Sequence, residues 1–236
     1  MDMPASRAVL IDLDGTLVDT APDIFAAVSH MLMEWGVAPL PFDTVRGFIG
    51  NGVPALVRQV LAASSTTGVD EQAALALFRR HYQDANGRYG TVFPGVREGL
   101  QGLRQAGYRL GCVTNKPQVL TAALLDRHDL ARWFDVVVAG DTLGRMKPDP
   151  GPLLHACRAL RADPAGCVLV GDSAVDVAAA RAARMAVYIV RYGYPGAGGH
   201  EGMECDGVID WIGEIQAILD ARRVSGPSYL ASRVPM

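Results

Sequence analysis

The stretch AVLIDLDGT, residues 8–16, decides the fold class of this chain. Its apolar residues lead directly into Asp12 and Asp14, and a glycine follows. Such a run is typical of a strand buried in a parallel sheet. Because side chains alternate along a strand, Asp12 and Asp14 should point to the same side. Sheets of this kind bind ligands beyond the carboxyl ends of their strands, so both carboxylates are candidate site residues.

Two neighbouring carboxylates repel each other, and their pairing predicts either a bound cation or a shared proton. Gly15 allows a sharp turn after them, and Thr16 can satisfy backbone groups in that turn. The alternative is a strand end followed by an Asx-type turn. That alternative would explain one aspartate, whereas a pair directly after an apolar strand favours a functional site.

Similar apolar runs recur further along the chain and alternate with helical patterns. The runs cover residues 109–114, 136–139, 167–171 and 187–190, with a last short run near Val208, and the helical patterns cover 94–106, 117–128, 150–161, 174–183 and 211–222. Strands that alternate with helices indicate an α/β fold built on a parallel sheet.

Residues 20–91 interrupt this alternation. They contain helical patterns at 22–35, 53–63 and 70–89, with no strand-like run between them. We interpret this segment as a helical insert placed directly after the first strand. At the other end, the tail 224–236 is short and rich in turn-forming residues, so we expect it to be frayed or loosely docked.

A second acidic group follows another apolar run, in the segment GDSAVD at residues 171–176. Asp172 ends the run, and Asp176 lies one helical turn further on. One alternative is that Asp172 or Ser173 simply caps the next helix. Capping would not explain why the acidic ends of two strands belong to the same edge of the sheet. Several carboxylates at that edge would form a hard, oxygen-lined site, which favours Mg²⁺ over softer metals.

Polar residues also follow two other strand-like segments. Thr114 and Asn115 end the run that begins at residue 109, where a hydroxyl and backbone N–H groups can hold phosphate or cap a helix. Lys147 precedes the prolines of the segment PDP at 148–150, which keep the backbone out of a helix and present the lysine from a stiff loop. The alternative for Lys147 is an ordinary lysine on the solvated surface. For Lys116, we predict such a solvated surface position.

Together these segments resemble the haloacid dehalogenase-like hydrolase superfamily, whose pattern is DxDGT, a Thr or Ser after a strand, a Lys, and GDxxxD. Within it, the following stretches resemble the phosphoglycolate phosphatases: IDLDGTLVDTAPDI, RGFIGNG (46–52), FPGV, VTNKP, GDTLGRMKPDP, VGDSAVDVAAARAA and YGY. The resemblance implies a Rossmann-like parallel-sheet core, residues 1–19 and 92–236, with an inserted α-helical cap, residues 20–91.

The resemblance also implies an activity and residue roles. The activity is Mg²⁺-dependent hydrolysis of a small phosphate monoester, 2-phosphoglycolate, through an aspartyl-phosphate intermediate, as part of carbohydrate metabolism. The implied roles are nucleophile for Asp12; general acid and base for Asp14; phosphate binding for Thr114, Asn115 and Lys147; metal binding for Asp12, Asp172 and the backbone carbonyl of Asp14; and support of the metal for Asp176.

Two further positions carry expectations of a different kind. The cap tip Gly50–Gly52, with Asn51 and Gly52 as candidate substrate contacts, could reach the site or could be an ordinary interhelical loop. Arg184 stands where relatives often have glycine, at a helix end that typically takes a left-handed conformation. An arginine there should cost some stability without touching the chemistry.

Four alternative functions share parts of this pattern. The substrate could be another ester, such as a sugar phosphate, a nucleotide or pyrophosphate. A phosphosugar mutase is a second alternative, although mutase-like relatives more often show GDSxxG, so Asp176 argues against it. A haloacid dehalogenase needs neither an acid at Asp14 nor a metal. A catalytically inactive binding protein would not require this complete set of polar groups.

Composition excludes several other classes of protein. Of 236 residues, 50% are hydrophobic and 20% are charged, and the formal net charge is −3, so neither nucleic acid nor an acidic membrane is an expected partner. The four cysteines (Cys112, Cys157, Cys167 and Cys205) form no CxxC pattern, which argues against zinc. Without a recognisable signal peptide or membrane span, we expect a cytoplasmic monomer or homodimer.

Overall fold

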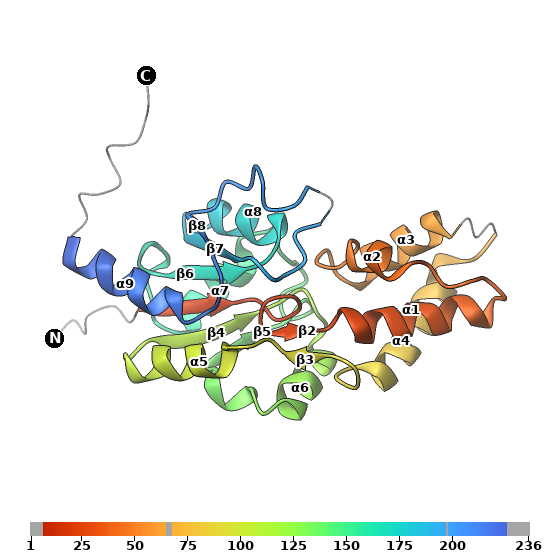
Figure 1. Cartoon of the computed structure of the whole chain (residues 1–236), viewed down its shortest axis with the longest axis horizontal. Coiled ribbons are helices and arrows are strands. Elements are labelled where there is room, and N and C mark those ends of the chain that lie inside the picture. Colours follow the sequence, from red (N-terminus) through yellow and green to blue (C-terminus); the bar gives the residue numbers. More distant parts are fainter. Residues whose placement is uncertain (1–6, 65–67, 197, 226–236) are drawn as a thin grey trace, which may run out of the picture.

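The computed structural model describes residues 7–64, 68–196 and 198–225, and its main feature is a six-stranded parallel sheet (Figure 1). The strand order is β5-β4-β1-β6-β7-β8. The strands are β1 (Ala8–Ile11), β4 (Arg109–Val113), β5 (Val136–Val138), β6 (Val168–Gly171), β7 (Ala186–Val190) and β8 (Gly207–Ile209).

The first strand lies inside the sheet because all four of its residues are apolar and buried. Ile11 of β1 pairs with Cys112 of β4 on one side and with Val170 of β6 on the other. After β5 the chain crosses over to the far side of β1 and continues with β6. The order of strands therefore reverses at β1, which is where open α/β sheets bind their ligands.

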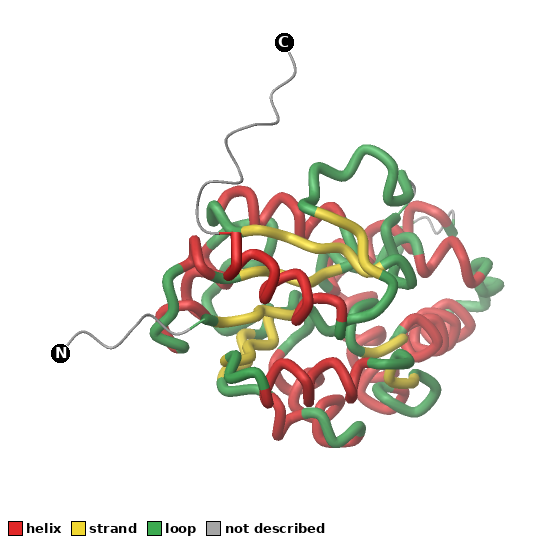
Figure 2. The backbone as a smooth tube through the Cα atoms, turned by 60° about the vertical axis from the view of Figure 1, so that its left-hand side comes forward, coloured by secondary structure: helices red, strands yellow, loops and turns green. Residues whose placement is uncertain are grey.

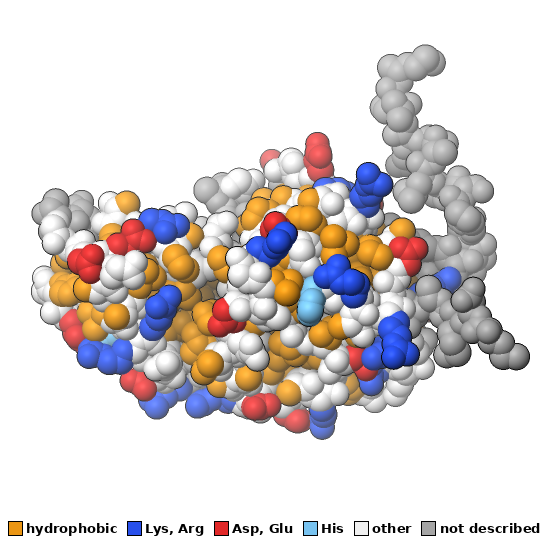
Figure 3. All heavy atoms as spheres, turned by 180° about the vertical axis from the view of Figure 1, so that it is seen from behind, with side chains coloured by type: hydrophobic (Ala, Val, Ile, Leu, Met, Phe, Trp, Pro, Cys, Tyr) orange, Lys and Arg blue, Asp and Glu red, His pale blue; other side chains and the backbone are white. Residues whose placement is uncertain are grey.

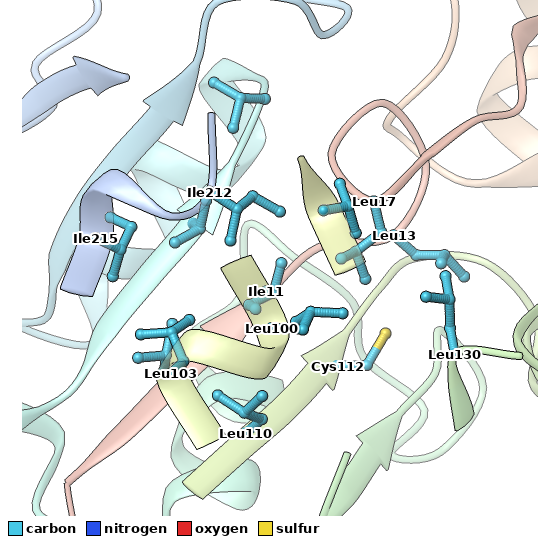
Figure 4. Packing of buried hydrophobic residues seen from close by; sticks show 14 of the residues in the cluster. Ile11, Leu13, Leu17, Leu100, Leu103, Leu110, Cys112, Leu130, Ile212 and Ile215 are labelled. Carbon is cyan, nitrogen blue, oxygen red and sulfur yellow. The ribbon is translucent and has the colours of Figure 1, made fainter. Parts of the chain in front are cut away.

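Helices cover both faces of the sheet and bury two separate apolar clusters (Figure 2). One face packs against α5 (Val96–Gln105), α6 (Gln118–Arg127) and α9 (Glu214–Ser225), and the other packs against α7 (Gly151–Ala159) and α8 (Ala174–Ala182). In the first cluster, Leu100 and Leu103 of α5 and Ile212 before α9 lie against Ile11 of β1 (Figure 4). Burial on both faces explains the uninterrupted apolar strands.

The segment after β1 leaves the sheet and forms four helices: α1 (Ala21–Glu34), α2 (Phe42–Arg46), α3 (Val53–Ala63) and α4 (Glu71–Ala85). They lie beyond the carboxyl ends of the strands, to the right in Figure 1. Their apolar faces form a third cluster that includes Val28, Val57 and Phe78. The chain leaves and re-enters the core through β2 (Val18–Asp19) and β3 (Thr91–Val92), which pair antiparallel.

The expected α/β class with a parallel sheet is confirmed. The short helix α2 and the β2–β3 pair were not predicted, because elements of five or two residues carry no measurable hydrophobic period. The expectation of a frayed tail concerns residues that, from 226 onwards, lie outside the described part of the chain. Across the described residues, no helix combines the length and apolar character needed to cross a bilayer. Acidic and basic side chains are interspersed on the face seen in Figure 3.

Candidate active site at the carboxyl edge of the sheet

The polar residues singled out in the sequence converge beyond the carboxyl ends of three neighbouring strands. Asp12 follows β1, Thr114 follows β4 and Asp172 follows β6, and all three are buried. The Asp12 N–H donates to the Val170 carbonyl over 2.9 Å, which extends the β1–β6 pairing up to the site. The sheet itself therefore fixes where these side chains start.

Asp12, Asp172 and Asp176 form a compact acidic cluster. Each offers a carboxylate oxygen, and the three oxygens lie within 4.8 Å of one another. All three residues are buried, so water screens their mutual repulsion weakly. Hard oxygen donors in this arrangement suit a small divalent cation, and the residues present therefore fit a metal site.

Lys147 is the cation that already balances part of this charge. It extends from the loop after β5, and its Nζ lies 2.9 Å from Asp12 Oδ1 and donates to Asp176 Oδ1 over 2.7 Å. Burial alone would lower the pKa of Lys147, but the two carboxylates outweigh it and raise that pKa above its usual value. Lys147 is therefore permanently charged at the centre of the site.

The pKa values of Asp12 and Asp172 are both raised above the usual value of an aspartate. Burial, together with the negative charge of Asp176, raises the pKa of Asp12 from 3.8 to about 7, although Lys147 opposes the shift. Burial and the charges of Asp176 and Asp12 raise the pKa of Asp172 well above 3.8. Both shifts reflect the cost of burying several anions whose charge Lys147 balances only in part.

Asp176 has two structural tasks at the start of α8. Its Oδ2 accepts hydrogen bonds from the Ser173 backbone N–H over 3.2 Å and from the Ser173 hydroxyl over 2.8 Å. Ser173 is the N-cap residue of this helix. The capping alternative considered from the sequence is therefore correct for Ser173. It coexists with the acidic cluster because the other oxygen of Asp176 binds Lys147.

Two glycines allow backbone to pass directly beside Asp172. Gly15 has φ +81°, and a Cβ there would come within 2.1 Å of Asp172 Oδ2. A Cβ on Gly193 would lie 2.2 Å from the Asp172 Cβ. The Tyr194 N–H donates to Asp172 Oδ2 over 2.7 Å. Close backbone approach thus fixes the orientation of the Asp172 carboxylate.

Asn115 connects three parts of the protein through its side-chain amide. Its Nδ2 donates to the carbonyls of Gly50 over 3.0 Å and Lys147 over 2.8 Å, and its Oδ1 accepts from the Lys147 N–H over 2.9 Å. The amide therefore positions the Lys147 loop and holds the tip of the helical insert. Nearby, the Thr114 hydroxyl accepts a hydrogen bond from the Lys116 N–H over 3.2 Å.

Lys116 is buried, and its interpretation as a solvated surface lysine was wrong. Its Nζ lies 3.2 Å from Asp14 Oδ1, donates to the Tyr82 hydroxyl and sits 4.3 Å from the centre of the Tyr82 ring. Its side chain is only 1% exposed. The sequence could not reveal this, since Tyr82 comes from α4 of the helical insert. A usable signal was overlooked: this chain contains just two lysines, Lys116 and Lys147.

A cavity lies between the helical insert and the sheet edge. The residues lining it are Asp12, Asp14, Ile24, Phe48, Ile49, Gly50, Gly52, Val53, Leu56, Phe78, Tyr82, Thr114, Asn115, Lys116 and Pro117. Of the insert tip, Gly50 and Gly52 line this cavity, whereas Asn51 is exposed and is not among the lining residues. The tip therefore reaches the site through backbone and not through the Asn51 side chain.

The connections between insert and core are held by residues that the sequence did not single out. The Tyr194 hydroxyl accepts the Ala21 N–H over 3.0 Å and also contacts Asp19. Asp23 of α1 is fully buried and accepts three backbone N–H groups, from Gly87, Tyr89 and Gly90. Asp23 thus joins the segment that leaves the core to the segment that returns.

Comparison with known proteins gives matches that cover most of the chain. A family model described as haloacid dehalogenase-like hydrolase matches residues 9–190. A protein of Cupriavidus necator named "Phosphoglycolate phosphatase, plasmid" is 56% identical over 92% of this chain and 95% of its own length. A phosphoglycolate phosphatase of Nitrosospira multiformis is 43% identical over 90% and 95% of the two chains. The crystal structure of a predicted phosphoglycolate phosphatase from Haemophilus somnus superposes with a TM-score of 0.85 at 27% identity, covering 92% of this chain and 99% of its own.

Proposed function

Because this chain belongs to the haloacid dehalogenase-like hydrolase family, we propose that it uses Asp12 to hydrolyse 2-phosphoglycolate through an aspartyl-phosphate intermediate. Its relatives and its fold identify it as a phosphatase, and the ester it cleaves is what the proposal adds. One observation carries the assignment: Asp12 lies in a buried acidic cluster, in contact with Lys147, and lines the cavity between the helical insert and the sheet edge.

The proposed first step is in-line attack of an Asp12 carboxylate oxygen on phosphorus. A new oxygen–phosphorus bond forms on Asp12, and the bond to the ester oxygen of the substrate breaks. Lys147, already beside Asp12, neutralises charge on the phosphoryl oxygens. The Thr114 hydroxyl orients these oxygens, and because the Asn115 amide is engaged elsewhere, the contact expected from Asn115 falls to its backbone N–H.

Asp14 is the proposed acid and base of the reaction. It lines the cavity beside Asp12 and is partly exposed, so it can exchange protons with water. In the first step it gives its proton to the departing alkoxide. In the second step it takes a proton from the water that attacks the aspartyl phosphate, which releases inorganic phosphate and regenerates Asp12.

The residues that would hold Mg²⁺ are Asp12, Asp172 and the backbone carbonyl of Asp14, with Asp176 in support. When bound, the ion would lower the repulsion between the Asp12 carboxylate and the dianionic phosphate. Support comes from the three carboxylate oxygens within 4.8 Å and from the raised pKa values of Asp12 and Asp172. Tyr194 and Gly15 keep the Asp172 carboxylate in place for this task.

Residues 20–91 would act as a cap that excludes water from the acyl phosphate and shapes the space for the leaving group. The support is their own apolar cluster and the lining they contribute to the cavity. The described cysteines are all free thiols, which agrees with the proposed reducing cytoplasm. Monomer or homodimer stays a prediction that size-exclusion chromatography with light scattering would decide.

A substrate panel with purified enzyme in Mg²⁺ tests the proposed function. The panel contains 2-phosphoglycolate, a sugar phosphate, a nucleotide, pyrophosphate and β-glucose 1-phosphate with mutase detection. We expect the highest kcat/KM for 2-phosphoglycolate, no turnover by Asp12→Asn, and activity lost in EDTA and restored by Mg²⁺. A higher kcat/KM for another ester would overturn the substrate, and normal turnover by Asp12→Asn would overturn the nucleophile.

A further inference from the structure

Lys116 is the one basic side chain among the described residues that line the cavity, and the proposed chemistry gives it no task. Lys147, which contacts Asp12 and Asp176, already supplies the positive charge that the proposed chemistry needs at the phosphoryl group. A buried ammonium carries a large desolvation cost unless it is paired. Lys116 has this pairing with Asp14, and Tyr82 of α4 covers it from the cap side.

We propose that Lys116 and the Tyr82 hydroxyl form the subsite that binds the carboxylate of the leaving group. This inference rests on the proposed function, in which the leaving group is glycolate. Asp14 would protonate the ester oxygen, and the carboxylate carbon of 2-phosphoglycolate is only two bonds from that oxygen. A cation 3.2 Å from Asp14 Oδ1 therefore lies within reach of this carboxylate.

The chemistry of the two groups suits a carboxylate. An ammonium and a phenol can both donate hydrogen bonds to its oxygens. Burial, together with the charge of Asp14, raises the pKa of Tyr82 well above 10, so the phenol keeps its proton. A substrate carboxylate would join Asp14 as a partner of Lys116 inside a dry cavity, where charge-assisted hydrogen bonds are strongest.

The rest of the cap lining explains why the preferred leaving group should be small. The cap contributes apolar side chains, namely those of Ile24, Phe48, Ile49, Val53, Leu56 and Phe78, and Tyr82 is its polar side chain among the described lining residues. A leaving group with several hydroxyls would leave them without hydrogen-bond partners against these apolar walls. A short carboxylate reaching Lys116 would avoid that cost.

The competing explanation is that Lys116 only holds Asp14 in position. The two explanations differ in what they predict for an ester that keeps the shape of 2-phosphoglycolate but lacks its charge. Ethyl phosphate is such an ester, since a methyl group replaces the carboxylate. A positioning role would affect both esters equally, whereas a carboxylate subsite would affect 2-phosphoglycolate selectively.

The kinetic test therefore compares kcat/KM for both esters in the wild type, Lys116→Met and Tyr82→Phe. We expect Lys116→Met to reduce kcat/KM for 2-phosphoglycolate by roughly 100-fold more than for ethyl phosphate, the size typical of a broken buried charge pair. Tyr82→Phe should give a selective loss of about 10-fold. Tyr89→Phe, at an exposed position of the returning segment, is the matched control and should change neither ester.

A binding measurement covers the case in which Lys116→Met fails to fold. The wild type labelled with lysine that carries ¹³C only at Cε should give two side-chain signals, because the chain has two lysines. Glycolate should shift one of them, assigned to Lys116 with Lys116→Arg, whereas ethanol, which lacks the carboxylate, should shift neither.

The outcomes separate this inference from the function on which it rests. Equal losses for both esters, or a Lys116 signal that ignores saturating glycolate, would overturn the subsite while 2-phosphoglycolate hydrolysis stands. A wild-type enzyme that hydrolyses other esters but not 2-phosphoglycolate would overturn the proposed function, and the subsite with it.

Discussion

The raised pKa of Asp12 makes a quantitative prediction about the stability of the metal-free protein. The pKa rises from 3.8 to about 7, chiefly because folding buries the carboxylate. A shift of about 3 pKa units corresponds to about 4 kcal/mol between the two protonation states. Because the folded-state pKa is the higher one, the folded protein binds the proton more tightly than the unfolded chain does.

The sign of the pH dependence follows from this linkage. The contribution of Asp12 to stability is fully present below pH 3.8 and is lost as the pH rises through about 7. Asp12→Asn keeps the shape of the protonated side chain and cannot ionise. As the pH rises from 5 to 8 in EDTA, the free energy of unfolding of the variant should therefore increase relative to that of the wild type by up to about 3 kcal/mol, since part of the total is already lost between pH 3.8 and 5. Rearrangement of Lys147 would reduce this difference.

The assay is urea unfolding of both proteins at pH 5, 6, 7 and 8 in EDTA, followed by fluorescence. Asp43→Asn, whose carboxylate is 82% exposed, is the control and should follow the wild type at every pH. Adding Mg²⁺ at pH 8 should restore the wild type and leave Asp12→Asn nearly unchanged, because the ion would replace the proton as the partner of Asp12. If the free energies of unfolding of the wild type and Asp12→Asn differ by the same amount at every pH from 5 to 8, the reasoning is refuted.

Three further substitutions test individual contributions to the stability of the fold by urea unfolding. Gly15→Ala should destabilise the folded protein by roughly 2–4 kcal/mol, because the added Cβ would meet Asp172 Oδ2. The same variant should bind Mg²⁺ more weakly in calorimetry, and unaltered Mg²⁺ binding would contradict this. Arg184→Gly should raise the free energy of unfolding by about 1 kcal/mol, because Arg184 has a φ of +56°. Arg158→Gly, within α7, is the control and should lower the free energy of unfolding. A lower free energy of unfolding for Arg184→Gly would show that the arginine is not strained. Asp23→Asn should cost about 2–3 kcal/mol by disturbing three charge-assisted hydrogen bonds, and a neutral result would show that they are dispensable.

The sequence was sufficient to predict the parallel sheet and the polar residues that follow its strands. Asp12 and Asp172 could be placed together because each ends an apolar run, and parallel strands end at one edge. The left-handed conformation expected at Arg184 is also present. These features depend on local pattern and on a general rule of topology, and both can be read from the order of residues.

The features that escaped prediction depend on contacts between distant segments. Lys116 is buried beneath the helical insert, where Tyr82, 34 residues earlier in the chain, lies over it. Tyr194 reaches Asp172 with its backbone and Asp19 with its hydroxyl, and nothing in the spacing of these residues indicates either contact. Hydrophobic periodicity specifies which face of an element is buried, but it does not specify which polar group lies opposite.

The two lysines lie in different parts of the site, and this separation is relevant to how substrate selectivity could change within the family. Lys147 is held by Asp12, Asp176 and the Asn115 amide, all from the core, and the insert touches this arrangement through the Gly50 carbonyl that the same amide binds. Lys116 stands at the boundary, paired with core Asp14 and covered by Tyr82 of the insert. Side-chain substitutions in the insert can therefore change the surroundings of the proposed leaving-group subsite while the contacts of Lys147 with Asp12 and Asp176 stay in place. A family built this way could exchange substrates without rebuilding its nucleophile.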